Sequence, residues 1–210
     1  KAYVTGILQR DVRDISNITD LTAMPKLLAQ LAMRSSGLMN LADIGRGIDA
    51  PHTTLRRYLS LLEATFLHVP LKPWTANRSN RLVKAEKIHL SDSGFAAHLC
   101  GIHSAGDLAK SDRFGNLLET FVVGELRKMS GWSKTSIEAF HFRNEKAREV
   151  DVVLEDSAGR VVGIEVKASA SIGSDDLIGL KQLREIAKDK WVRGIVLHSG
   201  PAITGFDKDL

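Results

Sequence analysis

The segment from Glu149 to Lys167 constrains the fold more than any other stretch of the sequence. Two runs rich in valine and isoleucine flank Ser157-Ala158-Gly159, which is typical of a β-hairpin whose three-residue loop holds its glycine in the left-handed conformation. In this register the residues on either side of the loop face each other, and counting back places Asp151 opposite Glu165. The hairpin therefore predicts two carboxylates on neighbouring strands.

The alternation of side chains along a strand predicts which residues share a face of the sheet. One face is expected to carry charged side chains, those of Glu149, Asp151, Glu165 and Lys167. The other face is expected to be apolar, with Val150, Val152, Ile164 and Val166. Facing carboxylates destabilise a sheet unless a cation joins them, and Mg²⁺ prefers one or two carboxylates together with substrate phosphate. The pattern predicts a magnesium site.

Two further residues complete the candidate site. Lys167 lies on the charged face, where its ammonium group is suited to orient a metal-bound water and to stabilise charge on an attacked phosphate. Glu119 flanks the apolar stripe of a helix expected at 112–129 and is expected to complete the metal shell. The candidate catalytic residues are Glu119, Asp151, Glu165 and Lys167, and the candidate metal ligands are Glu119, Asp151 and Glu165. A simpler interpretation stays open, because Glu149 faces Lys167 in this register and the lysine then serves as a cross-strand ion pair.

Hydrophobic periodicity predicts two domains. After the helix at 112–129, the second half shows further elements, with strands at 137–143, 148–154, 160–168 and 194–198 and a helix at 175–188. Helices on either side of a mixed central sheet make an α/β domain. Small and polar residues gather at 101–111, so we place a helical domain at 1–105 and the α/β domain at 106–210.

The first domain is predicted to be a winged helix-turn-helix. Amphipathic helices are expected first, at 2–15 and 20–34. A short helix at 41–48 and a helix at 53–63 capped by threonine follow, and together they form the helix-turn-helix pattern. Strands at 66–71 and 87–90, joined by a polar connection, match a wing, and another short helix starts at Asp92-Ser93-Gly94.

The distribution of charge points to a polyanion. Residues 1–111 hold 14 Lys/Arg against 9 Asp/Glu, whereas residues 112–210 hold 15 against 16. A basic helix-turn-helix half fits a nucleic-acid partner, with DNA favoured. The candidate nucleic-acid contacts are Arg56 and Arg57 on the second helix of the pattern and Lys72, Arg78, Arg81 and Lys84 in the wing. Winged helices also pack against proteins, so a protein-contact role stays open.

Several classes of protein are disfavoured by composition. No apolar run is long enough to cross a bilayer, and the first residues lack the apolar core of a secretory signal, which predicts a cytoplasmic protein without a membrane partner. Cys100 is the single cysteine, so an intrachain disulfide is excluded and a zinc ribbon disfavoured. The chain starts at a lysine inside an expected helix, which predicts a fragment of a longer protein. An oligomer stays open.

The order of Glu119, Asp151 and Glu165-Val166-Lys167 resembles the PD-(D/E)xK nuclease superfamily, with its restriction-endonuclease-like fold. Val150 stands where the superfamily's namesake proline would be. The resemblance implies hydrolysis of phosphodiester bonds at Mg²⁺. Gln182 resembles the glutamine that some related nucleases place near the site, although a solvated helix position is the favoured interpretation.

From near residue 1 to about residue 199, the chain also resembles the C-terminal region of prokaryotic AAA-type ATPases, known mainly as the domain-of-unknown-function 4143 family. The motifs that carry this likeness are Leu8–Val12, Lys87–Gly94, Gly115–Glu119, Glu149–Asp151 and Ile164–Lys167. The family implies an upstream ATPase domain of the same polypeptide. ATP would bind only there, because these residues contain no Gly-x-x-x-x-Gly-Lys-Ser/Thr phosphate loop.

Two functional hypotheses follow. The first is a nucleic-acid-binding module joined to a nuclease domain that hydrolyses phosphodiesters at a divalent metal. The second is a catalytically inactive regulatory or protein-interaction region that uses the same fold structurally. An ion pair between Glu149 and Lys167 that closes the site would favour the second hypothesis, and open, converging carboxylates would favour the first.

Overall fold

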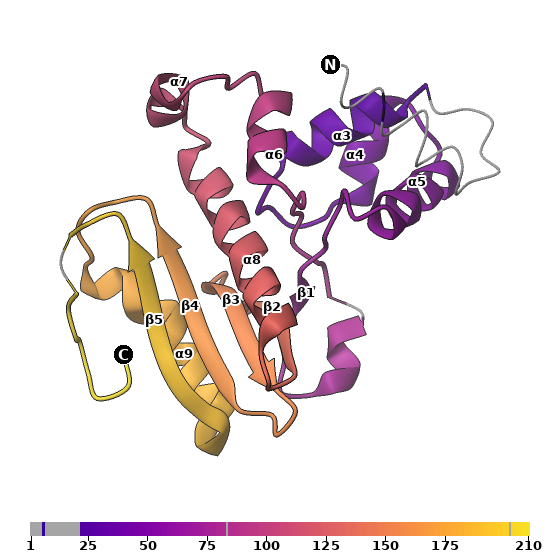
Figure 1. The fold of residues 1–210 in the computed structure, drawn as a ribbon. Helices are drawn as coiled ribbons and strands as arrows, with labels where there is room; N and C mark the ends of the chain where they lie inside the picture. The colour runs from indigo at the N-terminus through magenta and orange to yellow at the C-terminus, as the bar shows by residue number, and fades with distance from the viewer. Residues whose placement is uncertain (1–5, 7–21, 83, 202) are drawn as a thin grey trace.

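The computed structural model describes residue 6 and residues 22–82, 84–201 and 203–210. The helix expected at 2–15 and the Leu8–Val12 motif lie outside these residues. The described chain is a mixed α+β protein in which a helical half adjoins a five-stranded mixed sheet (Figure 1). No helix among the described residues has the length and apolar character that crossing a bilayer requires.

The helical half is built around one apolar cluster. Its helices are α3 (Met24–Met33), α4 (Leu41–Ile48), α5 (His52–Ala64), α6 (Ser93–Leu99) and α7 (Ala105–Lys110). Leu27, Leu31 and Leu55 are fully buried in the cluster. Asn40 caps α4 by accepting a hydrogen bond from the Asp43 amide.

The paired helices of the expected helix-turn-helix are present as α4 and α5. The expected threonine cap is wrong, because α5 starts at His52 directly after Pro51, and no side chain among the described residues caps it. Pro51 occupies the N-cap position, where its fixed φ suits the entry of the chain into the helix. Helix α7 was also not expected, and it lies in the stretch predicted as a domain boundary.

The segment predicted as a wing has a different structure. Leu71 bridges to Lys87 and His68 bridges to Leu90, but these are isolated bridges rather than a regular hairpin. The chain then forms β1 (Lys72–Pro73), which pairs in parallel with β2 (Ile137–Arg143), and a 3-10 helix, η2 (Arg78–Leu82). The segment thus joins the sheet of the other half, across the predicted boundary.

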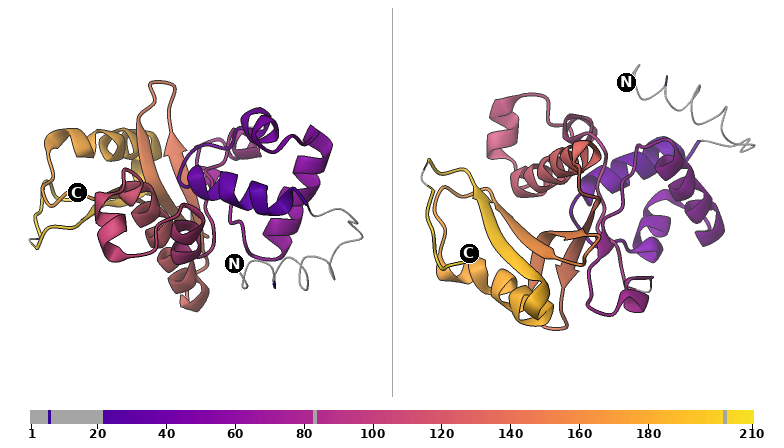
Figure 2. Two further views of the ribbon diagram at one scale, coloured as in Figure 1. Left: turned by 90° about the horizontal axis from the view of Figure 1, so that it is seen from above. Right: turned by 60° about the horizontal axis from the view of Figure 1, so that its bottom comes forward.

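The central sheet has the order β1-β2-β3-β4-β5, where β3 is Glu149–Asp156, β4 is Val161–Lys167 and β5 is Trp191–His198. Helix α8 (Phe114–Trp132) covers one face and helix α9 (Ile178–Ala187) the other (Figures 1 and 2). Short 3-10 helices, η3 (Ser174–Leu177) and η4 (Lys188–Lys190), flank α9. The mixed sheet between helices is confirmed.

The predicted hairpin register is also confirmed. Strands β3 and β4 pair Val152 with Ile164 and Glu155 with Val161, and continuing this register sets Asp151 against Glu165. Gly159 has φ +78°, the left-handed conformation expected of it. The loop closes tightly because the Asp156 amide donates to the Arg160 carbonyl over 3.1 Å.

The predicted division of β3 into a charged and an apolar face is wrong. Phe142 pairs with Val150 and Phe140 pairs with Val153, so two residues of β3, Asp151 and Val152, lie opposite His141. This β-bulge breaks the alternation. Val150 therefore packs in the cluster with α9, whereas Val152 packs with Val123 of α8.

Candidate functional site

The four residues predicted to be catalytic line one cavity. Glu119 enters from α8, Asp151 from β3, and Glu165 and Lys167 from β4, around a space of about 420 Å³. The three acidic residues are buried, with side chains 10–12% exposed. The sequence pattern therefore identified a group of side chains that the fold brings together.

The cavity opens where β3 and β4 separate. Their paired residues end at Val152 and Ile164. Beyond this point the Val166 amide donates 2.9 Å to Asp151 Oδ2, so a side chain replaces the backbone acceptor of the neighbouring strand. This hydrogen bond fixes the carboxylate of Asp151 at the bulge.

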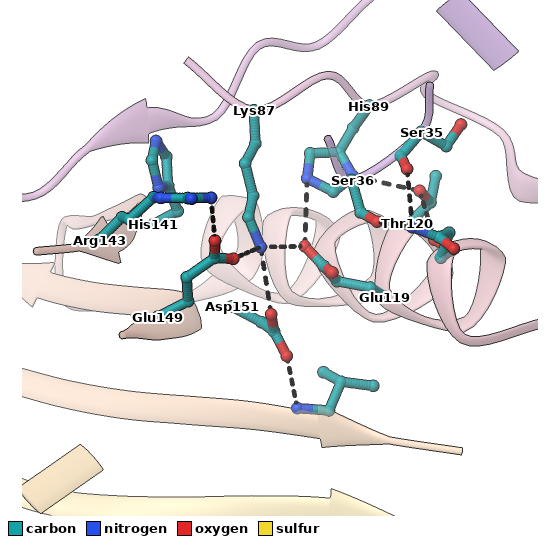
Figure 3. Close-up of polar contacts among 12 residues, drawn as sticks. Ser35, Ser36, Lys87, His89, Glu119, Thr120, His141, Arg143, Glu149 and Asp151 are labelled. Atoms are coloured by element: carbon teal, nitrogen blue, oxygen red, sulfur yellow. Dashed lines mark hydrogen bonds and ion pairs between the residues drawn. The ribbon is translucent and has the colours of Figure 1, made fainter. Parts of the chain in front are cut away.

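A residue outside the predicted site, Lys87, supplies a cation to these carboxylates (Figure 3). Its Nζ lies 2.9 Å from Glu119 Oε1, 3.1 Å from Asp151 Oδ1 and 3.6 Å from Glu149 Oε2. The whole residue is 2% exposed. In the sequence, Lys87 begins the return strand of the predicted wing and the Lys87–Gly94 motif, and neither pattern assigned it to the site.

A magnesium ion requires several oxygen ligands that converge on one position. The donors have suitable chemistry, because Mg²⁺ prefers carboxylate oxygens. However, Lys87 lies between Glu119 and Asp151, and within the described parts of the chain no three acidic, histidine or cysteine side chains are grouped to hold a metal ion. The side chains as arranged do not fit the predicted ion.

Burial and mutual repulsion perturb the acidic groups. Burial, with the nearby charge of Asp151, raises the pKa of Glu119 to about 8 and that of Glu165 to about 7. Burial alone would lower the pKa of Lys87, but the carboxylates of Glu119 and Asp151 outweigh it and raise that pKa.

The expected ion pair between Glu149 and Lys167 does not form. Glu149 pairs with Arg143 and Lys87. Lys167 Nζ instead lies 3.0 Å from Glu165 Oε1 and 3.4 Å from an oxygen of Asp176. Glu165 Oε2 is buried and has no hydrogen-bond partner within the described residues.

Two buried histidines, His89 and His141 of β2, lie near the cluster (Figure 3). His89 Nδ1 lies 3.2 Å from Thr120 Oγ1, and burial, with the charge of Lys87, lowers the pKa of His89. His141 Nε2 lies 3.1 Å from the Ala85 carbonyl. Burial, with the charges of Lys87 and Arg143, lowers the pKa of His141 to about 4. Both rings are therefore neutral at pH 7.

The neutral state of His141 predicts a loss of stability in mild acid. Between its unfolded pKa of 6.5 and its folded pKa of about 4, the unfolded chain binds a proton that the folded chain does not. The contribution of neutral His141 to the free energy of unfolding is therefore complete above pH 6.5, and it is lost as the pH falls towards 4. From pH 7 to pH 5, urea unfolding should show the wild type losing about 2 kcal/mol more than His141→Gln. Equal losses in the two proteins would contradict this prediction.

The predicted nucleic-acid contacts divide into two groups. Arg56, Arg57, Lys72 and Lys84 are exposed, and the first two lie on the outer side of α5. Arg78 and Arg81 instead contact Glu155 of β3, at 3.0 and 2.6 Å. The side chain of Arg81 is only 10% exposed, so this guanidinium is used within the protein.

The comparisons with known proteins divide the chain into two parts. The family described as Domain of unknown function (DUF8612) matches residues 1–106, which is half of the chain. The chain belongs to the DUF8612 family. In this DUF8612 protein, residues 114–209 match a second family, Domain of unknown function (DUF4143). The second match is the family that the sequence motifs resembled, but it covers the sheet half rather than nearly the whole chain.

Two mycobacterial relatives align with the DUF8612 chain. They are the uncharacterized proteins Mb2031c of Mycobacterium bovis and Rv2008c of Mycobacterium tuberculosis, each 28% identical over 169 residues. The aligned region covers 80% of this chain and 37% of each relative, so the chain spans little more than a third of their length. No solved structure matches the chain.

Proposed function

We propose that the sheet half is a nuclease domain of the PD-(D/E)xK type that hydrolyses phosphodiester bonds in nucleic acid, with DNA favoured. The convergence of Glu119, Asp151, Glu165 and Lys167 on one cavity carries this proposal. Burying several carboxylates together costs stability. Natural proteins retain such unfavourable arrangements mainly at functional sites. A purely structural role does not require these four side chains to share an open cavity.

The side chains have distinct roles in this proposal. Glu165 lines the cavity, and this carboxylate is proposed as the group that accepts a proton from the attacking water. Lys167, 3.0 Å from Oε1 of Glu165, stabilises the negative charge that develops on the phosphate. Asp151, fixed by the Val166 amide, and Glu119 line the same cavity.

Nucleic acid is negatively charged, so its binding beside this acidic cavity requires positively charged residues nearby. Arg148 lines its rim, and Lys146 lies exposed in the adjacent turn. Arg56 and Arg57 on α5, together with Lys72 and Lys84, are proposed to bind the phosphate backbone. Arg81 is left out of this interface because it pairs with Glu155. An upstream ATPase in the same polypeptide remains a proposal from the family resemblance.

A cleavage assay tests the proposed function. The purified chain is incubated with linear, branched and single-stranded DNA, with and without Mg²⁺ or Mn²⁺. We expect cleavage by the wild type and a loss of at least about 100-fold in Asp151→Asn and in Lys167→Ala. Lys190→Ala is the matched control. Lys190 is exposed and does not line the cavity, so this variant should cleave like the wild type. Equal cleavage in all four proteins would assign the activity to a contaminant.

The alternative is a regulatory or protein-interaction region without catalysis. The position of Lys87 favours it, because an ammonium between Glu119 and Asp151 neutralises the site without a metal. On this alternative, a correctly folded wild type cleaves none of the substrates under any metal condition.

A further inference from the structure

The buried ammonium of Lys87 is a feature that a metal-dependent nuclease does not require. It comes from the helical half, yet it lies within 3.6 Å of carboxylate oxygens from α8 and β3 (Figure 3). Mg²⁺ binds carboxylate oxygens at roughly 2.0–2.1 Å. An ion on the same oxygens of Glu119 and Asp151 would meet a second positive charge at close range in a buried setting. The two cations therefore exclude each other.

An independent observation shows that the carboxylates have capacity for another ligand. Glu165 is 8% exposed and lines the cavity, and its buried Oε2 has no hydrogen-bond partner among the described residues. Lys87 does not reach this oxygen within ion-pairing distance. Glu119, Asp151 and Glu165 all line this cavity, so the acidic residues around it are not all neutralised by Lys87.

We propose that Lys87 is the resident cation of this site and excludes a divalent metal ion from Glu119 and Asp151. The inference rests on the proposed function in taking the cavity as the nuclease site. Lys87 is a positioning residue, held by backbone bridges to Leu38 and Leu71.

Metal binding measured by calorimetry tests the inference without relying on activity. Mn²⁺ is titrated into the whole chain as wild type, Lys87→Met, Lys87→Arg and Lys84→Met. Lys87→Met should bind Mn²⁺ at least about tenfold more tightly than the wild type, because it removes the competing charge but keeps the length of the side chain. Lys87→Arg keeps the positive charge and should bind Mn²⁺ as weakly as the wild type. Lys84→Met removes an exposed lysine from the same segment and should resemble the wild type.

Two further variants make the result decisive. Asp151→Asn in the Lys87→Met protein should abolish the gain, which assigns the bound ion to this cavity. If Lys87→Met does not fold, the double variant Lys87→Met/Glu119→Gln removes both partners of the ion pair and leaves Asp151 and Glu165 as ligands. It should also bind Mn²⁺ more tightly than the wild type.

The outcomes separate this inference from the proposed function. Equal Mn²⁺ affinity in the wild type and the folded Lys87 variant would overturn the exclusion by Lys87, whether or not DNA is cleaved. Tighter binding in the variant, with no cleavage by either protein, would support the exclusion and overturn the nuclease function.

Discussion

Replacing Gly179 with alanine is expected to destabilise the protein by about 3 kcal/mol or more. A Cβ at this position of α9 would overlap the Glu149 carbonyl oxygen and lie 3.3 Å from Val150 Cγ2. The obstacle is backbone of β3, which no side-chain rotation can relieve. Helix α9 must therefore move away from the sheet, close to the cavity.

The sign of this effect makes the measurement informative. In a helix with open space, glycine to alanine stabilises by roughly 0.5–1 kcal/mol. Gly131→Ala in α8 is the matched control, because a Cβ there meets no atom of the described structure within 4 Å. Chemical denaturation of both variants should show opposite changes in the free energy of unfolding. A Gly179→Ala protein as stable as the wild type would refute this close contact between α9 and β3.

Replacing Arg81 with methionine is expected to cost about 3 kcal/mol of stability. Arg81 donates to both carboxylate oxygens of Glu155, over 2.6 and 3.2 Å, and its Nε donates to the Thr75 carbonyl. Its guanidinium also lies 4.7 Å from the centre of the Phe140 ring. The variant leaves the buried carboxylate of Glu155 without its bidentate partner, so unfolding in urea should shift to lower concentrations.

A double-mutant cycle separates this role from nucleic-acid binding. Glu155→Gln removes the charge but keeps an acceptor for the Trp74 indole, which donates 2.6 Å to Glu155. The double variant Arg81→Met/Glu155→Gln should recover about half of the loss, because no buried charge remains unpaired. Arg78→Met, at an arginine with a 71% exposed side chain, should change stability by less than about 1 kcal/mol. If Arg81→Met weakened DNA binding without loss of stability, this assignment would be wrong.

The hairpin shows how far local sequence determines this protein. The loop glycine, the valine-rich runs and their lengths were sufficient to predict the register of β3 and β4, because these signals act between residues close along the chain. Helices α4, α5 and α8 followed from periodicity in the same way. The candidate residues Asp151, Glu165 and Lys167 were within reach of this reasoning, since all three lie in the hairpin.

Tertiary structure decided which cation neutralises the site and which arginine of the predicted wing pairs inside the protein. Lys87 meets Glu119 and Asp151 across 32 and 64 residues of sequence, and Arg81 meets Glu155 across 74. No local pattern distinguishes a lysine or arginine that pairs inside a fold from one that remains free for a phosphate. That distinction depends on which carboxylate the packed chain brings to it, because burying an unpaired charge costs far more than exposing it.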